Sequence, residues 1–461
     1  MSKIAYRTLL SVSTSILIAV LCASAAAQSH ITGTLPDGAT YVIDVPANWN
    51  GALLLYSHGY VAPGNSNPAL DVGDPLTGGY LLNAGYALAG SSYATTGWAV
   101  HEALPDQIAV LDVFATKVGT PTQTIAWGHS LGGMITAGLV QQYPGRFNAA
   151  MPMCGVVAGG VGLWNQGLDG AFAFNTLVAG GALQVVDITN PLMNVTDAEA
   201  FLTAAQATPQ GQARIALAAA LDDVPGWYDP LSTEPAPTDY TTREANQFLW
   251  FENVDFIFQF YLRAELEARA GGNPSWNTGV NYVKQLKRSA DNAEVQALYA
   301  AAGLSLTADL ATLNHAARIA ADPAAKTYLS ENIIYNGQLT IPVLTLHTTG
   351  DGLVAVENER AYKTTVNEAN DTAFLRETFV HRAGHCEFTP AETLTAFQRL
   401  STRLATGKWK NLAPAGMNSA AASLGPTFNV LLVNGQIVPV APAFEKFQSP
   451  PFLRPFDAFS Q

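Results

Sequence analysis

A serine between two glycines is the first feature of the sequence that could do chemistry. The segment Gly128-His129-Ser130-Leu131-Gly132 follows an apolar run typical of a buried strand and precedes an apolar segment with helical spacing. The strand-to-helix turn is so tight that it needs small residues two positions either side of the serine, and the helix start favours developing negative charge. We predict that Ser130 is a nucleophile, with an ordinary turn as the alternative in a chain of 39 glycines.

A serine hydroxyl needs a base, and the base needs an acid that fixes its tautomer. Both are expected later in the chain, each just past a strand of the same sheet. Asp351 follows a predicted strand over 339–347, and its alternative is an ordinary Asp-Gly turn. Two histidines follow the next predicted strand. We prefer His385 to His381, because Gly384 permits a sharp loop into the site.

The negative oxygen that forms during acyl transfer needs aimed hydrogen-bond donors. One predicted donor is the backbone N–H of Leu131, directly after the nucleophile. The other is the backbone N–H of Tyr60, in the loop His58-Gly59-Tyr60 that follows an early apolar run.

The elements that must position these residues alternate between strands and helices. This alternation predicts an α/β protein with a mostly parallel sheet. The expected elements are a hairpin over 31–46, strands over 52–57, 86–91, 122–127, 149–154, 339–347 and 374–380, and helices over 100–118, 131–143 and 390–404.

The alternation stops in the middle of the chain. A Gly-rich stretch over 155–181 precedes a segment that is almost wholly helical, from about 197 to 331. A connection of this length must carry its own structure, so residues 156–336 are predicted to form a helical lid. The sheet domain then comprises residues 28–155 and 337–461. Its C-terminal part contains a predicted hairpin over 428–440 and a Pro/Phe-rich tail expected to wrap the surface.

At this point the chain resembles the α/β-hydrolase fold serine esterases and lipases. The family order of nucleophile, acid and base matches Ser130, Asp351 and His385, and the resemblance covers about residues 50–154 and 339–404. It implies an eight-stranded, mostly parallel sheet, a covalent acyl-enzyme, and neither metal nor cofactor.

The first 27 residues read as a signal peptide. Lys3 and Arg7 precede an apolar run over 9–21 and a small-residue cleavage site at 25–27. The run is too short for a transmembrane anchor, and no later stretch is long and apolar enough to span a bilayer. We therefore expect a secreted protein, extracellular or periplasmic, with no stable membrane anchor.

Two cysteines, Cys154 and Cys386, remain after cleavage. An even pair in an oxidising compartment favours a disulfide, and two unpaired buried thiols are the alternative. The chain also partly resembles tannases and feruloyl esterases, which place one cysteine before the nucleophile and another after the catalytic histidine. Cys386 matches the second position, whereas His129 occupies the first. Cys154 ends the strand that follows the nucleophile helix, close enough to substitute for that first cysteine. We therefore predict a Cys154–Cys386 disulfide that tethers the His385 loop.

The helical segment is rich in aromatic residues around 248–261. Most of them must be buried in the lid's own core, but some are expected to face Ser130. Phe251 and Trp164 are the candidates for the substrate pocket. An apolar, aromatic pocket favours hydrophobic acyl or aromatic esters over sugars.

The composition narrows the possible classes of protein. The 461 residues carry a net charge of −13 and are 48% hydrophobic but only 13% charged, which excludes disorder and argues against a nucleic-acid partner. We expect a secreted serine hydrolase acting on small-molecule or polymeric carboxylic esters. An exopeptidase that holds the substrate amine with Glu244, Glu252 or Asp255 is the alternative, and a non-catalytic binding protein is a third possibility.

Overall fold

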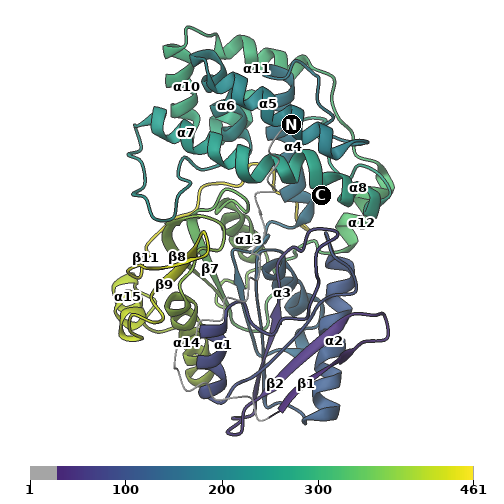
Figure 1. Cartoon of the computed structure of the whole chain (residues 1–461), viewed down its shortest axis with the longest axis vertical. Coiled ribbons are helices and arrows are strands. Elements are labelled where there is room, and N and C mark those ends of the chain that lie inside the picture. Colours follow the sequence, from purple (N-terminus) through teal and green to yellow (C-terminus); the bar gives the residue numbers. More distant parts are fainter. Residues whose placement is uncertain (1–28, 460–461) are drawn as a thin grey trace.

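The computed structural model describes residues 29–459, which form a central sheet flanked by helices and a group of helices inserted into it (Figure 1). The predicted signal peptide lies outside the described residues. Among the described helices, none is long and apolar enough to cross a membrane.

Nine strands make up the sheet, in the order β1-β2-β4-β3-β5-β6-β7-β8-β11. Neighbours from β4 to β8 run parallel, whereas β1, β2 and β11 add antiparallel pairs at the edges. The inner parallel strands β3 and β6 are buried on both faces, as their continuous apolar sequences require. The strands are β1 (Ser29–Thr34), β2 (Thr40–Val45), β3 (Ala52–Ser57), β4 (Ala87–Ser91), β5 (Gln123–His129), β6 (Ala149–Met153), β7 (Val343–Gly350), β8 (Leu375–Ala383) and β11 (Phe444–Glu445).

Helices cover both faces of the sheet, each over its own apolar core. One face packs against α2 (Val100–Lys117), α3 (Leu131–Gln142) and α13 (Glu357–Glu368). The other packs against α1 (Pro75–Asn83), α14 (Pro390–Thr406) and α15 (Pro414–Ser423). Because the carboxyl ends of parallel strands meet at one edge, the loops after β3, β5, β7 and β8 come together there.

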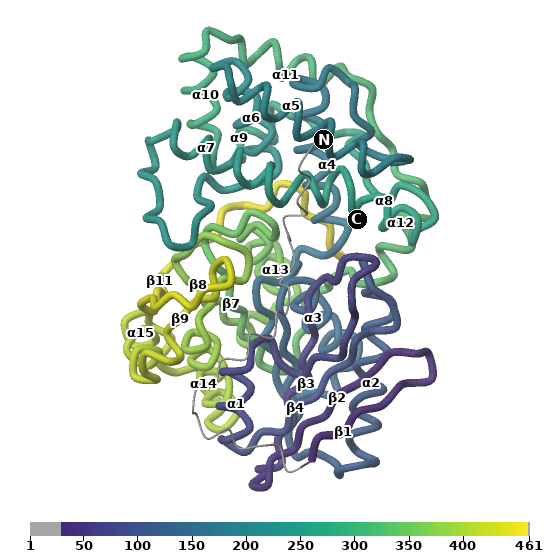
Figure 2. The backbone as a smooth tube through the Cα atoms, in the orientation of Figure 1, coloured from purple at the N-terminus to yellow at the C-terminus, as the bar shows by residue number. Residues whose placement is uncertain are grey.

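The helices between β6 and β7 lie at one end of the molecule, away from β1 and β2 (Figure 2). They enclose an apolar core of their own, which includes the fully buried rings of Phe251, Phe256 and Phe260. These helices are α4 (Gly160–Leu177), α5 (Pro191–Gln206), α6 (Pro209–Leu221), α7 (Tyr240–Trp250), α8 (Arg263–Ala270), α9 (Tyr282–Arg288), α10 (Asn292–Ala301), α11 (Leu306–His315) and α12 (Pro323–Glu331). We call this group the lid.

The expected strands and helices of the sheet domain are present, with ends that coincide with the prediction or differ from it by up to four residues. The largest displacement is at β7, which begins at Val343 rather than at residue 339. The Gly-rich stretch, for which no helix was predicted, contains α4. Its glycines allow close packing, since a Cβ on Gly170 would lie 2.4 Å from an oxygen of Asp222.

The C-terminal region forms the predicted hairpin from β9 (Val430–Val433) and β10 (Gln436–Pro439). The sheet has nine strands rather than eight because β11 then pairs with β8, Phe444 opposite Val380. The tail does more than wrap the surface. It runs between the lid and the sheet domain (Figure 2), where Arg454 forms an ion pair with Asp169 of α4.

Candidate active site

Ser130 lies at the turn between β5 and α3, in a backbone conformation that few non-glycine residues adopt. Its φ is 59° and its ψ is −123°. A Cβ on Gly128 would lie 2.4 Å from the carbonyl oxygen of Ser57, and one on Gly132 only 1.9 Å from it. Glycine is therefore required at both positions, and the turn presents the serine above the edge of the sheet.

Three side chains from separate loops form one hydrogen-bonded line. The Ser130 hydroxyl donates to Nε2 of His385 at 2.8 Å, and Nδ1 of His385 donates to Oδ2 of Asp351 at 2.7 Å. His385 follows β8 through Gly384, whose φ is +99°, and Asp351 follows β7 directly. The geometry therefore matches the arrangement required to deprotonate a serine.

Asp351 is completely buried and held on several sides. Its Oδ1 accepts the backbone N–H groups of Leu353 at 3.1 Å and Val354 at 3.0 Å. Burial alone would raise the pKa of Asp351, but His385 and His347 outweigh it and lower the pKa below its usual value. The carboxyl group is thus kept as an anion, which His385 needs as an acceptor.

His385 is accessible whereas its acid is not. The exposed fraction of the His385 side chain is 20%, against 0% for Asp351. The competing His381 is 42% exposed and pairs instead with the surface residues Glu445 and Glu234. The structure thus places His385 beside Ser130 and directs His381 away from it.

The structure joins Cys154 and Cys386 in a disulfide across 232 residues. Cys154 directly follows β6, and Cys386 directly follows His385. The bond fixes the loop of the base to the strand next to the nucleophile. Although Cys154, Cys386 and His385 could offer three ligand atoms within 4.8 Å, the two sulfurs are bonded to each other.

The predicted oxyanion donors flank the nucleophile. Leu131 begins α3 directly after Ser130. On the other side, a Cβ on Gly59 would lie 3.3 Å from the Cβ of Ser130, so the loop carrying Tyr60 runs against the serine. The Tyr60 side chain points to the lid, where its hydroxyl lies 3.5 Å from Glu265 and its ring packs edge-on against Phe258.

The lid touches both loops that flank the site. A Cβ on Gly352, next to Asp351, would lie 2.3 Å from the indole of Trp250, and Phe258 packs on Tyr60. Directly after Trp250 the chain forms two π-helical turns, Phe251–Asp255 and Phe258–Leu262. Such turns are rare and often found at functional sites. This lid segment therefore bridges the acid loop and the Tyr60 loop.

The two predicted pocket residues have different surroundings. Trp164 is buried on α4, where its ring packs edge-on against Trp98 and Arg263 lies over it. Phe251 is fully buried in the core of the lid and stacks on Phe256 with ring centroids 4.9 Å apart. The structure thus places Phe251 in the lid core, where its ring packs on Phe256.

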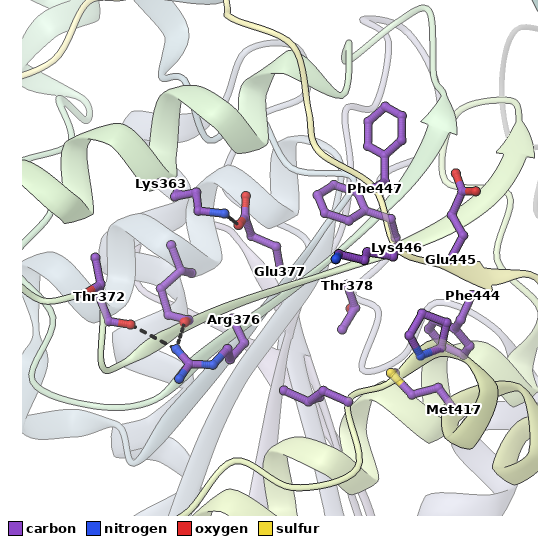
Figure 3. Close-up of a pocket in the computed structure, with 14 residues that line it drawn as sticks. Lys363, Thr372, Arg376, Glu377, Thr378, Met417, Phe444, Glu445, Lys446 and Phe447 are labelled. Carbon is purple, nitrogen blue, oxygen red and sulfur yellow. Dashed lines mark hydrogen bonds and ion pairs between the residues drawn. The ribbon is translucent and has the colours of Figure 1, made fainter.

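A surface groove of about 370 Å³ lies elsewhere, between α13, β8, α15 and β11 (Figure 3). Three of its charged groups have partners that do not involve a ligand. Lys363 pairs with Glu377, and Arg376 donates to the carbonyls of Thr372 and Leu375. None of the three aligned side chains lines it, so we do not assign it to the reaction.

The order of the strands and the positions of Ser130, Asp351 and His385 after them identify the fold. This is the α/β-hydrolase fold. The nucleophile follows β5, the acid follows β7 and the base follows β8, so the fold implied by the sequence resemblance is confirmed.

Comparisons with known proteins point in the same direction. The prolyl oligopeptidase family pattern matches residues 89–159, which include the nucleophile turn. The chain is 29% identical over 445 residues to o-phthalyl amidase of Xanthobacter agilis, covering 88% of this chain and 94% of that protein. Among solved structures, an esterase from Aspergillus oryzae (16% identity, 83% of this chain, 80% of that one) and feruloyl esterase B from the same organism (12%, 83% and 81%) are similar, both with a TM-score of 0.40. The match to the amidase, which spans most of both chains, supports a hydrolase.

The sequence did not indicate the residues that pack behind Asp351. His347 and Glu359 are buried beneath Asp351, and Trp250 covers the neighbouring Gly352. His347 was visible only as the last residue of a predicted strand, and nothing in its spacing to Glu359 marks the pair.

Proposed function

We propose that this chain is a secreted serine hydrolase that cleaves carboxylic esters through an acyl-enzyme on Ser130. The observation that carries the proposal is the continuous hydrogen-bonded line from Asp351 through His385 to Ser130. It supplies a nucleophile, a base and an orienting acid at a sheet edge covered by an aromatic-rich lid.

The reaction follows from the donors and acceptors in the site. His385 accepts the Ser130 proton at Nε2 as the oxygen attacks the carbonyl carbon, while Asp351 stabilises the resulting imidazolium. The backbone N–H groups of Leu131 and Tyr60 hold the negative oxygen of the tetrahedral intermediate. His385 then protonates the departing alcohol, and finally activates the water that releases the acid.

Amide hydrolysis is the second candidate, and the long match to an amidase favours it. The same residues can cleave an amide if His385 protonates the departing nitrogen. A lid carboxyl group could then accept a substrate N–H group. Of the three lid carboxyl groups considered, Glu244 is buried beside Gln206, and Glu252 lies next to Asn253. Among residues 29–459, one oxygen of Asp255 and one of Glu244 have no hydrogen-bond partner. Asp255 is buried and lies near enough to Asp351 for their charges to interact.

The bond class is tested with matched substrates. Purified protein is assayed on p-nitrophenyl esters and p-nitroanilides of the same aromatic and aliphatic acids. Ester hydrolysis that Ser130→Ala abolishes supports the proposal. Turnover of anilides alone would replace the ester proposal with the amide one, and Asp255→Asn should then weaken binding of substrates with an N–H group. Turnover unaffected by Ser130→Ala would overturn both.

Export is a separate part of the proposal. The disulfide supports an oxidising compartment. Mass spectrometry of the mature protein from its native host should give an N-terminus near Gln28, in the medium or periplasm. A protein that keeps its first 27 residues in the cytoplasm would contradict export without affecting the proposed chemistry.

A further inference from the structure

A second histidine lies behind Asp351, enclosed by acceptors. His347 projects from β7 and is fully buried. Its Nδ1 lies 3.0 Å from Oε1 of Glu359, and its Nε2 lies 2.8 Å from the carbonyl oxygen of Val354 and 3.6 Å from Oδ2 of Asp351. Each ring nitrogen thus lies next to an oxygen that accepts hydrogen bonds, and two of these three oxygens belong to carboxyl groups, whose negative charge favours a ring with hydrogen on both nitrogens.

The anion on the far side of this ring is fixed. Glu359 projects from α13, and its second oxygen accepts the hydroxyl of Thr345 at 2.6 Å. Thr345 and His347 stand two residues apart on β7, so both face α13. The result is a buried series of alternating charge: Glu359, His347, Asp351 and, during the reaction, protonated His385.

We propose that His347 is a positioning residue, a permanent imidazolium that keeps Asp351 anionic and aimed at His385. This inference rests on the proposed function, because it assigns His347 a role in the same reaction. Removing the cation leaves a buried, uncompensated negative charge, which must then recruit a proton at higher pH than before.

The carboxylates on both sides of the His347 ring favour its protonated form. Burial alone would lower the pKa of His347, but Asp351 and Glu359 raise it to about 10. His58 provides an internal comparison. Its nitrogens face two carbonyl oxygens and no carboxylate, and burial lowers its pKa.

Other titratable groups lie near these four residues, and their effects on the pH profile must be distinguished from that of His347. Burial raises the pKa of Glu357 to about 8 and that of Glu387 to about 7, and raises that of Asp255 well above its usual value. Burial lowers the pKa of His129, which faces His385, to about 4. Glu387 titrates where the pH–rate profile is measured, so Glu387→Gln is a necessary reference.

The kinetic test compares His347→Gln with His381→Gln, an exposed histidine on β8, and with Glu387→Gln. The Nε2 of His347 and the Nδ1 of His385 lie 3.6 and 2.7 Å from one oxygen, so they are at most 6.3 Å apart. A unit charge at that distance is expected to move the acid limb of the kcat/KM profile by about 1 to 2 pH units. We expect His347→Gln to move the limb to higher pH and His381→Gln to leave it in place. A fall in kcat with the limb unmoved would mean a merely structural role and overturn the proposal.

A spectroscopic test on the wild-type protein does not depend on activity. In protein with ¹⁵N-labelled histidine, the His347 ring should remain protonated at both nitrogens from pH 6 to 9. Its signals can be assigned by their loss in His347→Gln or by contacts to Val354. A ring with one bare nitrogen at pH 8 would overturn the proposal. If Ser130 were not the nucleophile, hydrolysis would be unaffected by Ser130→Ala while this signature persisted, so the two failures are distinguishable.

Discussion

Removing the Cys154–Cys386 disulfide should destabilise the protein and loosen the base. The bond closes a loop of 232 residues. In the chain-entropy model, a loop of that length restricts the unfolded chain enough to contribute about 5 kcal/mol to the free energy of unfolding at 25 °C. We expect the double variant Cys154→Ala/Cys386→Ala to lose most of that amount.

The same change should reduce turnover, because Cys386 adjoins His385. Without the bond, His385 is held only by its own hydrogen bonds and the loop around it. A displacement of about 1 Å at a reacting group can reduce the rate about 100-fold, so we expect kcat to fall by up to that factor with a smaller change in KM.

The assay is urea unfolding followed both by near-UV circular dichroism and by labelling of Ser130, so that the transition of the active site is identified. Reduced wild-type protein is the control for the substitutions. Reductant should move the wild-type midpoint toward that of the double variant and leave the double variant unchanged. A double variant within about 0.5 kcal/mol of wild type and fully active would refute the reasoning.

Three further predictions concern stability and the nucleophile turn. Burial lowers the pKa of His129 from the ordinary 6.5 to about 4, so the unfolded chain binds more protons than the folded protein between these pH values. The free energy of unfolding should therefore fall by up to about 3 kcal/mol from pH 6.5 to pH 4, as measured by urea titrations. The fall should be smaller in His129→Asn. Gly132→Ala would place a Cβ 1.9 Å from a main-chain oxygen of β3 and should abolish Ser130 labelling, whereas Gly145→Ala, with open space around it, should not. Arg382→Met leaves the fully buried Glu392 uncompensated and should cost about 3 to 5 kcal/mol by calorimetry or urea unfolding; a loss below 1 kcal/mol would contradict that assignment.

The sheet and the nucleophile turn were predictable because their signals are local. A short continuous apolar run indicates a strand buried on both faces, as in β3, and the glycines around Ser130 are required by contacts to the neighbouring strand. The acid and base were located by a topological rule, because residues just past parallel strands meet at one edge.

The remaining features depend on contacts between distant segments. The strand β11 has only two residues and forms because the tail pairs with β8. The helix α4 is rich in glycine, and tertiary packing of those glycines overrides their low helix propensity. The aromatic residues around Phe251 occupy all sides of their helix, so the sequence could not show which of them face the sheet. In the structure, Phe251 lies in the lid core.

Labelling by a fluorophosphonate, mapped by peptide mass spectrometry, tests the central claim most directly. The arrangement of Ser130, His385 and Asp351 predicts a single adduct on Ser130 that forms at least 1,000-fold more slowly in His385→Ala, on the order of the loss expected when a triad member is removed. An adduct on another residue, or undiminished labelling without His385, would contradict the account.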